Sequence, residues 1–202
     1  DSGSTNNQAI MLAKISIGSD SVRSSITLGR ADTIYMGQDN LYTSYFSYNT
    51  EVEVSCGFWD QINGGCFDRP NRAEQSTVIY RTDLSDQNMI PEARGEEGSL
   101  INQFAMDERQ SNLRVATTSE QGNNLFILDR DLNQISSIEG IEEDERIFSV
   151  RFYENIGFMV TFEQIDPLFT FDLSDPNNPK LLGELKITGY SDYLHCLKMT
   201  CS

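Results

Sequence analysis

Short runs of alternating apolar and polar residues recur in groups of four along this 202-residue chain, separated by Asp, Asn, Gly and Pro. The clearest group lies between residues 146 and 187, with the runs "IFSVRFY", "IGFMVTF", "LFTFDLS" and "KLLGELKI". Such alternation is typical of β-strands, and tight polar turns between them favour antiparallel pairing. This group therefore predicts a four-stranded antiparallel meander, with the length of about forty residues that one propeller blade has.

The same pattern precedes this group in the chain. Residues 99–141 form a second set of four runs, and residues 31–93 form a third, in which residues 50–75 are inserted between the second and third strands. Residues 9–30 supply only two strands of a further blade, and residues 188–202 read as an irregular tail. We therefore expect one all-β domain, a β-propeller fragment of about three and a half four-stranded antiparallel blades.

Propeller blades bury both faces against their neighbours, which explains strands such as "FMVTF" that are apolar at nearly every position. An open ring leaves the outer faces of its terminal blades uncovered. We expect the chain to be part of a longer ring, with apolar residues exposed on these faces, among them Phe152, Phe158, Val160 and Phe169.

Several of these stretches resemble a known family. They are "INQFAMDERQSNLRVATTS", "ERIFSVRF", "VTFEQIDPLFTFDLSDPNNPKLLGELKI" and "SDYLH". They are similar to secreted bacterial and archaeal proteins with a C-terminal β-propeller domain, distant relatives of WD-repeat proteins. The resemblance implies a large secreted or cell-surface propeller, and it supplies no catalytic residues. After "SDYLH" the chain departs from the family and continues with "CLKMTCS".

The formal net charge of −16 argues against nucleic acid as a partner, because a phosphate backbone would be repelled and no basic stripe offsets this. No stretch approaches the roughly 18 apolar residues of a membrane span. The abundant carboxylates read mainly as a solvated exterior. Calcium binding is the alternative that they leave open, because carboxylates suit hard cations.

Four cysteines occur as two pairs, of which Cys56 and Cys66 bracket the inserted segment "CGFWDQINGGC". A disulfide that closes this loop is the favoured interpretation, with free thiols and a metal site as alternatives. A zinc site is disfavoured because His195 is the only histidine and CxxC knuckles are missing. A disulfide would place the protein in an oxidising compartment, secreted or at the cell surface.

Catalytic motifs such as GxSxG, HExxH or a phosphate-binding glycine loop are missing from the sequence. The candidate ligand-binding residues instead lie on the rim formed by the links between second and third strands and between blades. They are Glu120, Gln121, Glu145, Arg146, Glu163, Gln164 and Asp166. Arg114 and Arg151 lie within apolar strands, and we expect them to hold neighbouring blades together through buried pairs.

Two functions remain open at this point. The first is a non-catalytic secreted or cell-surface scaffold that binds a protein or a glycan. The second is a propeller hydrolase or metal-dependent lyase whose site lies largely in further blades, because propellers host both kinds of activity. No cofactor is predicted.

Overall fold

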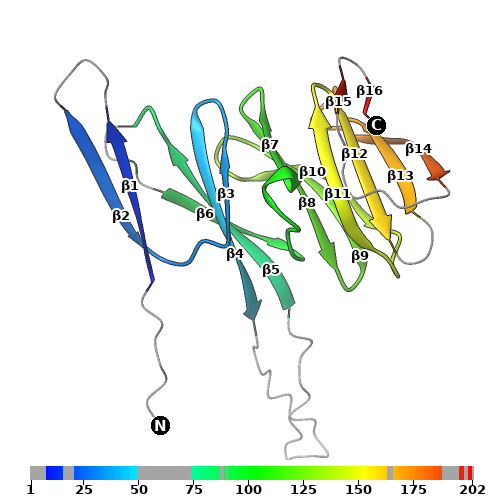
Figure 1. The fold of residues 1–202 in the computed structure, drawn as a ribbon, viewed down its shortest axis with the longest axis horizontal. Helices are drawn as coiled ribbons and strands as arrows, with labels where there is room; N and C mark the ends of the chain where they lie inside the picture. Colours follow the sequence, from blue (N-terminus) through cyan, green and yellow to red (C-terminus); the bar gives the residue numbers. More distant parts are fainter. Residues whose placement is uncertain are drawn as a thin grey trace, which may run out of the picture.

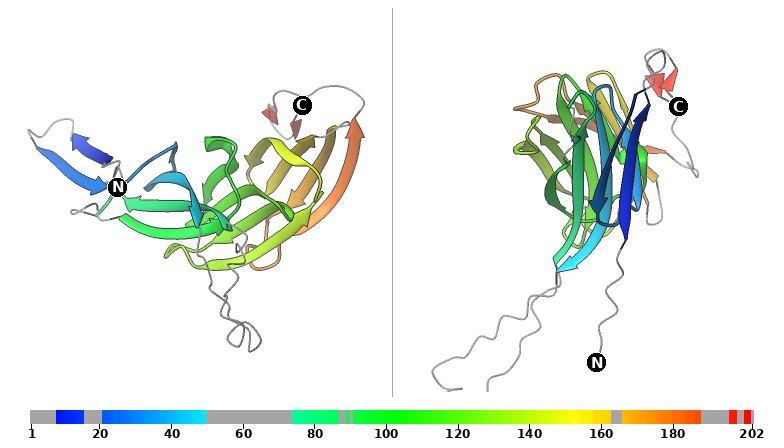
Figure 2. Two further views of the ribbon diagram at one scale, coloured as in Figure 1. Left: turned by 90° about the horizontal axis from the view of Figure 1, so that it is seen from below. Right: turned by 90° about the vertical axis from the view of Figure 1, so that its left-hand side faces the viewer.

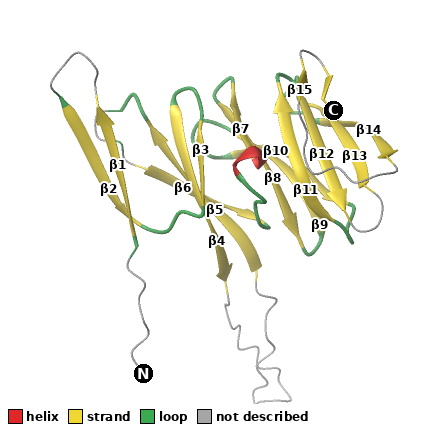
Figure 3. Cartoon of the chain, in the orientation of Figure 1, coloured by secondary structure: helices red, strands yellow, loops and turns green. Residues whose placement is uncertain are grey.

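Three four-stranded antiparallel sheets stand side by side in the computed structural model and form an open arc (Figures 1 and 2). The structure describes residues 8–15, 21–49, 74–86, 89, 91–162, 166–187, 196–197 and 200–201. Figure 3 shows that the described part consists of strands joined by loops and turns, and its helical residues are the 3-10 turn η1 (Gln103–Ala105). The predicted all-β propeller architecture is confirmed.

Each sheet is a meander in which consecutive strands pair. The first contains β3 (Thr33–Met36), β4 (Asn40–Asn49), β5 (Glu74–Asp83) and β6 (Pro91–Glu97). The second contains β7 (Met106–Arg109), β8 (Asn112–Ser119), β9 (Gly122–Leu128) and β10 (Gln134–Ile141). The third contains β11 (Arg146–Tyr153), β12 (Ile156–Phe162), β13 (Asp166–Asp172) and β14 (Lys180–Ile187).

Two small sheets flank the arc. β1 (Ala9–Ile15) pairs with β2 (Val22–Leu28) at the N-terminal end. At the other end, where the sequence predicts an irregular tail, the two-residue strands β15 (Cys196–Leu197) and β16 (Thr200–Cys201) pair. No helix among the described residues is long and apolar enough to cross a membrane.

The core lies between the sheets, and β9 shows why its sequence is apolar throughout. All seven residues of this strand are buried. Leu125 and Ile127 pack in the cluster shared with β11–β13, whereas Phe126 and Leu128 pack in the cluster shared with β3–β5. Successive side chains of a strand point to opposite faces, so a sheet between two neighbours buries both.

The passage from the first sheet to the second depends on one glycine. Gly98 has φ +90°, and a Cβ at this position would lie 2.6 Å from the carbonyl oxygen of Thr118. The chain then continues into an isolated bridge between Ser99 and Thr118. Only glycine combines this backbone conformation with so close an approach.

The expected exposure of the terminal blade faces is wrong at two of the four named residues. Val160 and Phe169 are only 2% and 3% exposed, and Phe152 is half-buried. Phe169 stands opposite Met159 in the β12–β13 register, and both pack in the core shared with the preceding sheet. Within the third sheet, the exposed large apolar residues lie on the outermost strand β14, where Leu182 and Leu185 are each 60% exposed.

Candidate functional site

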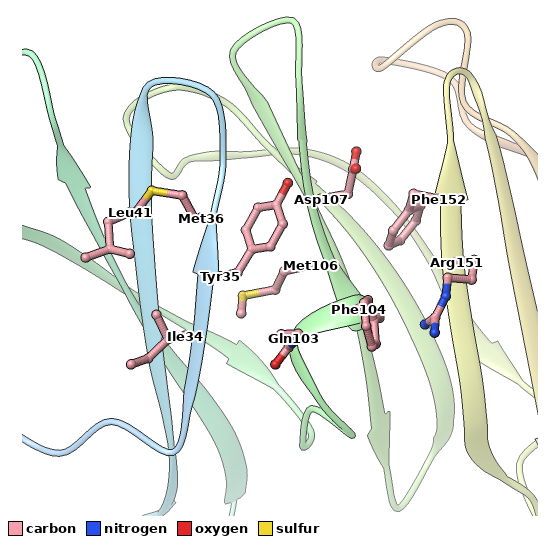
Figure 4. Close-up of a pocket in the computed structure, with 10 residues that line it drawn as sticks. All are labelled: Ile34, Tyr35, Met36, Leu41, Gln103, Phe104, Met106, Asp107, Arg151 and Phe152. Carbon is pink, nitrogen blue, oxygen red and sulfur yellow. The ribbon is translucent and has the colours of Figure 1, made fainter. Parts of the chain in front are cut away.

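A groove with a volume of about 440 Å³ opens where the first strands of the three sheets, β3, β7 and β11, converge. These strands each pair on one side only, so their other edges face the inside of the arc. Figure 4 shows the ten residues that line the groove. They are Ile34, Tyr35, Met36, Leu41, Gln103, Phe104, Met106, Asp107, Arg151 and Phe152.

The turn η1 carries Phe104 into the groove. Asn102 caps this turn, and its side-chain oxygen accepts a hydrogen bond of 2.9 Å from the backbone N–H of Phe104. The turn precedes β7, which begins at Met106. Asparagine favours such local capping over strand pairing, so Asn102 was the available signal for this turn.

Arg114 fixes one end of the groove. Its Nε donates to Asp107 Oδ2 at 2.9 Å, and its Nη1 donates to the carbonyl oxygen of Glu154 at 2.7 Å. The guanidinium also lies 5.0 Å from the centre of the Phe152 ring. Because Glu154 and Phe152 belong to the next sheet, this buried arginine joins two blades, but it does so through a backbone carbonyl and an aromatic ring, whereas its ion pair with Asp107 lies within the second sheet.

Arg151 also joins two blades, and one of its contacts is with an aromatic ring. Its guanidinium lies 3.7 Å from the centre of the Phe104 ring, within the range of a cation–π contact. Its Nη1 donates to the carbonyl oxygen of Val150 at 2.8 Å. The contact holds a positive charge over an aromatic face in the groove.

A polar cluster supports the opposite wall. The backbone N–H of Glu108 donates to the Tyr35 hydroxyl at 2.9 Å, and the Tyr35 ring stacks on Tyr42 with centres 5.9 Å apart. Burial, together with the charges of Asp107 and Glu108, raises the pKa of Tyr35. The hydroxyl therefore stays protonated at neutral pH.

Glu108 itself is tied to the first sheet. Its carboxylate accepts a hydrogen bond from the side-chain amide of Asn40 and lies against Gly37, where a Cβ would come within 1.8 Å of Oε2. This second oxygen is buried and has no hydrogen-bond partner within the described part of the chain. The close fit places a carboxylate where only glycine leaves room for it.

The groove is suited to binding a ligand, because it combines exposed apolar side chains with a few fixed polar groups. No group of three or more His, Cys, Asp or Glu that could hold a metal ion occurs among the described residues. The Asp107 carboxylate is engaged by Arg114. The arrangement therefore suits recognition of a ligand by shape and charge.

The structure brings together four of the predicted rim residues. Glu120 and Gln121 are exposed in the β8–β9 turn, and the Gln121 carbonyl oxygen lies 3.7 Å from the position that a Cβ at Gly140 would take. Arg146 is exposed at the start of β11, and Glu145 is half-buried just before it. This rim is built from the link before β11 and the neighbouring turn.

Hydrogen bonds within the protein already engage some groups of this rim. The hydroxyl of Thr161 donates to the Glu145 carboxylate, which ties the link to β12. The fully buried Asn123 donates through Nδ2 to the carbonyl oxygens of Ile141 at 2.9 Å and Glu145 at 3.2 Å. Glu145 thus stabilises the link between two blades.

The structure describes the other predicted residues only in part. Glu163 and Gln164 lie outside the described residues, as do Cys56 and Cys66. The backbone of Asp166 starts β13 and pairs with Ile187.

Sequence reasoning missed the groove because its residues come from segments far apart in the chain. Ile34, Phe104 and Arg151 lie on β3, η1 and β11. The available signal was the arginine within the apolar run "IFSVRFY", which would be costly to bury without a partner.

Three adjacent four-stranded meanders with their first strands around a common groove define a β-propeller. The chain belongs to the family described as the beta propeller domain, whose model matches residues 2–200.

Two archaeal relatives, both described as uncharacterized proteins, are similar to this chain. One, from Archaeoglobus fulgidus, is 47% identical over 121 residues, which cover 58% of this chain and 20% of the relative. The other, from Methanocaldococcus jannaschii, is 50% identical over 105 residues, which cover 48% of this chain and 17% of the relative. The matched region thus spans about a fifth of the length of these relatives.

Proposed function

We propose that this propeller is a non-catalytic binding scaffold and that the groove between β3, β7 and β11 holds its protein or glycan ligand. The observation that carries the proposal is the convergence of exposed apolar side chains and a positioned arginine from three blades on one cavity of about 440 Å³. Cavities of this size, apolar with a few oriented polar groups, are the usual form of a ligand site.

The lining is preorganised, which favours affinity. The backbone of Phe104 is held by the cap at Asn102, and Asp107 is held by Arg114. A ligand therefore orders few side chains when it binds, and this lowers the entropic cost of association.

The alternative of a hydrolase or lyase receives no specific support from this geometry. The one carboxylate that lines the groove, Asp107, is already paired with Arg114. We therefore propose that the rim residues Glu120, Gln121 and Arg146 make further contacts with a large ligand and do not act as catalytic groups.

We also propose that the protein is secreted or displayed at the cell surface. The support is the family resemblance and the spacing of Cys56 and Cys66, which suits a loop-closing disulfide. Peptide mapping under non-reducing conditions tests this. A linked pair supports an oxidising compartment, and two free thiols in protein from its native host would contradict it.

Binding of the full-length protein to arrays of peptides and oligosaccharides tests the scaffold proposal. Phe104→Ala removes the ring that lies under Arg151, and Leu185→Ala is the matched control on the outermost strand, where the side chain is 60% exposed. We expect the best ligand to lose about 10-fold in affinity with Phe104→Ala and less than about 2-fold with Leu185→Ala. Equal affinities for all three proteins would overturn the proposal.

A further inference from the structure

We infer that a second site, a small cavity between the second and third sheets, binds a carboxylate group. The cavity has a volume of about 20 Å³ and shares no lining residue with the groove. It lies at the end of the arc where the β7–β8 and β11–β12 turns are found (Figure 1). A ligand of this cavity touches other side chains than a ligand of the groove, so the inference goes beyond the proposed function.

The charged residues that line the cavity are two arginines, Arg109 at the end of β7 and Arg114 on β8. Arg114 is paired with Asp107. Arg109 donates through Nε to Asn155 Oδ1 at 2.9 Å and forms no ion pair with any residue that the structure describes. A positive charge therefore lies at this cavity without a counter-charge, in a chain whose net charge is −16.

Hydrogen-bond donors surround the cavity. Because Nε of Arg109 is used, its open donors are Nη1 and Nη2, a fork that matches the two oxygens of a carboxylate. Asn155 accepts through Oδ1, so its Nδ2 remains as a further donor. The side-chain amides of Gln110 and Asn112 also line the cavity, and neither forms a hydrogen bond with another side chain or backbone group in the described part of the chain. Such a surplus of donors suits an anion.

The size of the cavity limits the part of the ligand that it can hold. A volume of about 20 Å³ holds roughly one water-sized group, because a buried water needs about 10–15 Å³. One carboxylate oxygen fits this space, and the second oxygen stays at the opening. Ile127 and Leu173, which are 1% and 6% exposed, exclude water from part of the wall. Hydrogen bonds from a guanidinium to an anion are stronger beside such buried apolar side chains, because the local dielectric constant is low.

Acidic residues near the cavity favour a singly charged ligand. Glu154 precedes Asn155 in the chain, and Asp172 and Asp175 lie close in sequence to the third-sheet residues of the wall, but none of these three acids lines the cavity. Their carboxylates repel a second negative charge, so a dianion such as phosphate gains less at Arg109 than a carboxylate does. Chloride carries one charge but lacks the paired oxygens that the guanidinium fork matches.

Line broadening of the carboxyl carbon of ¹³C-labelled acetate tests the inference, with the full-length protein in a low-salt HEPES buffer. Unlabelled acetate, N-acetylglycine, chloride and phosphate are the competitors. We expect saturable broadening that unlabelled acetate reverses at a concentration about 10-fold lower than chloride or phosphate does. Reversal by chloride or phosphate at the same concentration as acetate, or at a lower one, would overturn the inference.

Variants assign the binding to named side chains. Arg109→Gln should weaken acetate binding by about 10-fold or more, and Arg109→Lys should recover only part of it, because an ammonium group lacks the fork. Asn155→Asp keeps the arginine but places a counter-charge beside it, and it should also abolish acetate binding. Acetate binding that is unchanged in both Arg109→Gln and Asn155→Asp would overturn the inference.

Arg130→Gln is the matched control for the loss of one positive charge. Arg130 is exposed, pairs with Asp83 at 3.0 Å and does not line the cavity. Its replacement should change the affinity for acetate by less than about 2-fold, because salt and solvent screen a distant charge. An equal loss in Arg130→Gln and Arg109→Gln would show that net charge alone controls the binding, and this would also overturn the inference.

Competition by N-acetylglycine separates two sources of the carboxylate. Displacement as strong as that by acetate supports the carboxylate end of a larger molecule, whereas displacement by acetate alone supports a free small acid. The scaffold proposal is tested independently, because Arg109→Gln removes no side chain of the groove and should leave binding there unchanged.

Discussion

Replacing Arg114 with methionine should destabilise the second sheet, where Arg114 pairs with Asp107, and its contact with the third sheet, where Arg114 donates to the carbonyl of Glu154. Only 5% of the arginine side chain is exposed, and 27% of its partner Asp107 is. Breaking a buried ion pair by removing one partner costs about 3–5 kcal/mol. Water can reach Asp107 in part, which offsets some of this, whereas the carbonyl of Glu154 also loses its donor. We therefore expect the free energy of unfolding to fall by about 3 kcal/mol.

Urea denaturation of the full-length protein, followed by far-ultraviolet circular dichroism, measures this change. With a slope of about 2–3 kcal/mol per molar urea, the midpoint should fall by about 1 M. Arg109→Met is the matched control, because Arg109 Nε donates to Asn155 Oδ1 at 2.9 Å across the same pair of sheets but at an exposed site. The control should cost no more than about 0.5 kcal/mol.

A second substitution tests whether the unpaired carboxylate of Asp107 causes the loss of stability. In the double variant with Asp107→Asn, the carboxylate that Arg114→Met leaves unpaired is removed, so about 1 kcal/mol or more should be recovered. Equal midpoints for Arg114→Met and Arg109→Met would refute the conclusion that the buried contacts of Arg114 stabilise the fold.

Two further predictions concern a close approach and an acidic turn. Gly37→Ala places a Cβ 1.8 Å from Glu108 Oε2 and should lower the urea midpoint through a cost of about 1–3 kcal/mol, whereas Gly183→Ala, which meets no atom within 4 Å, should leave it unchanged or slightly higher. Hydrogen bonds from the hydroxyl and backbone N–H of Ser85 hold the pKa of Asp83 at about 2, below its unfolded value of about 3.9. Stability that is present above pH 4 is therefore lost as the pH falls towards 2, and urea midpoints of Asp83→Ala and wild type should converge there. Midpoints that differ by the same amount at pH 7 and pH 2 would contradict this.

The fold was accessible from the sequence because strand periodicity is a local signal. The uninterrupted apolar run at β9 follows from burial on both faces, and all seven of its residues are buried. The turn at Asp172 was also predictable, because its carboxylate accepts from the backbone N–H of Ser174 at 2.9 Å, as Asp does in Asx turns.

The groove and the exposure of the terminal blade faces could not be predicted from the sequence. Both depend on which neighbouring sheet each face of a strand packs against. The alternation of apolar and polar residues does not distinguish the two faces when both faces of a blade are buried. Phe169 was therefore expected on the outer face although it packs inward against the preceding sheet. The turn at η1 was missed because the apolar residues around Asn102 fit a strand pattern equally well.

Photo-cross-linking from position 104 tests most directly that the first strands of three blades converge on one groove. A benzophenone side chain in place of Phe104 should form adducts with the β11 segment at Arg151 and Phe152 and with β3 at Ile34 and Met36, because all of these line the same cavity. Adducts found in both segments, far apart in the chain, are the predicted result. Adducts confined to residues 99–141 would contradict the convergence and the binding groove that depends on it.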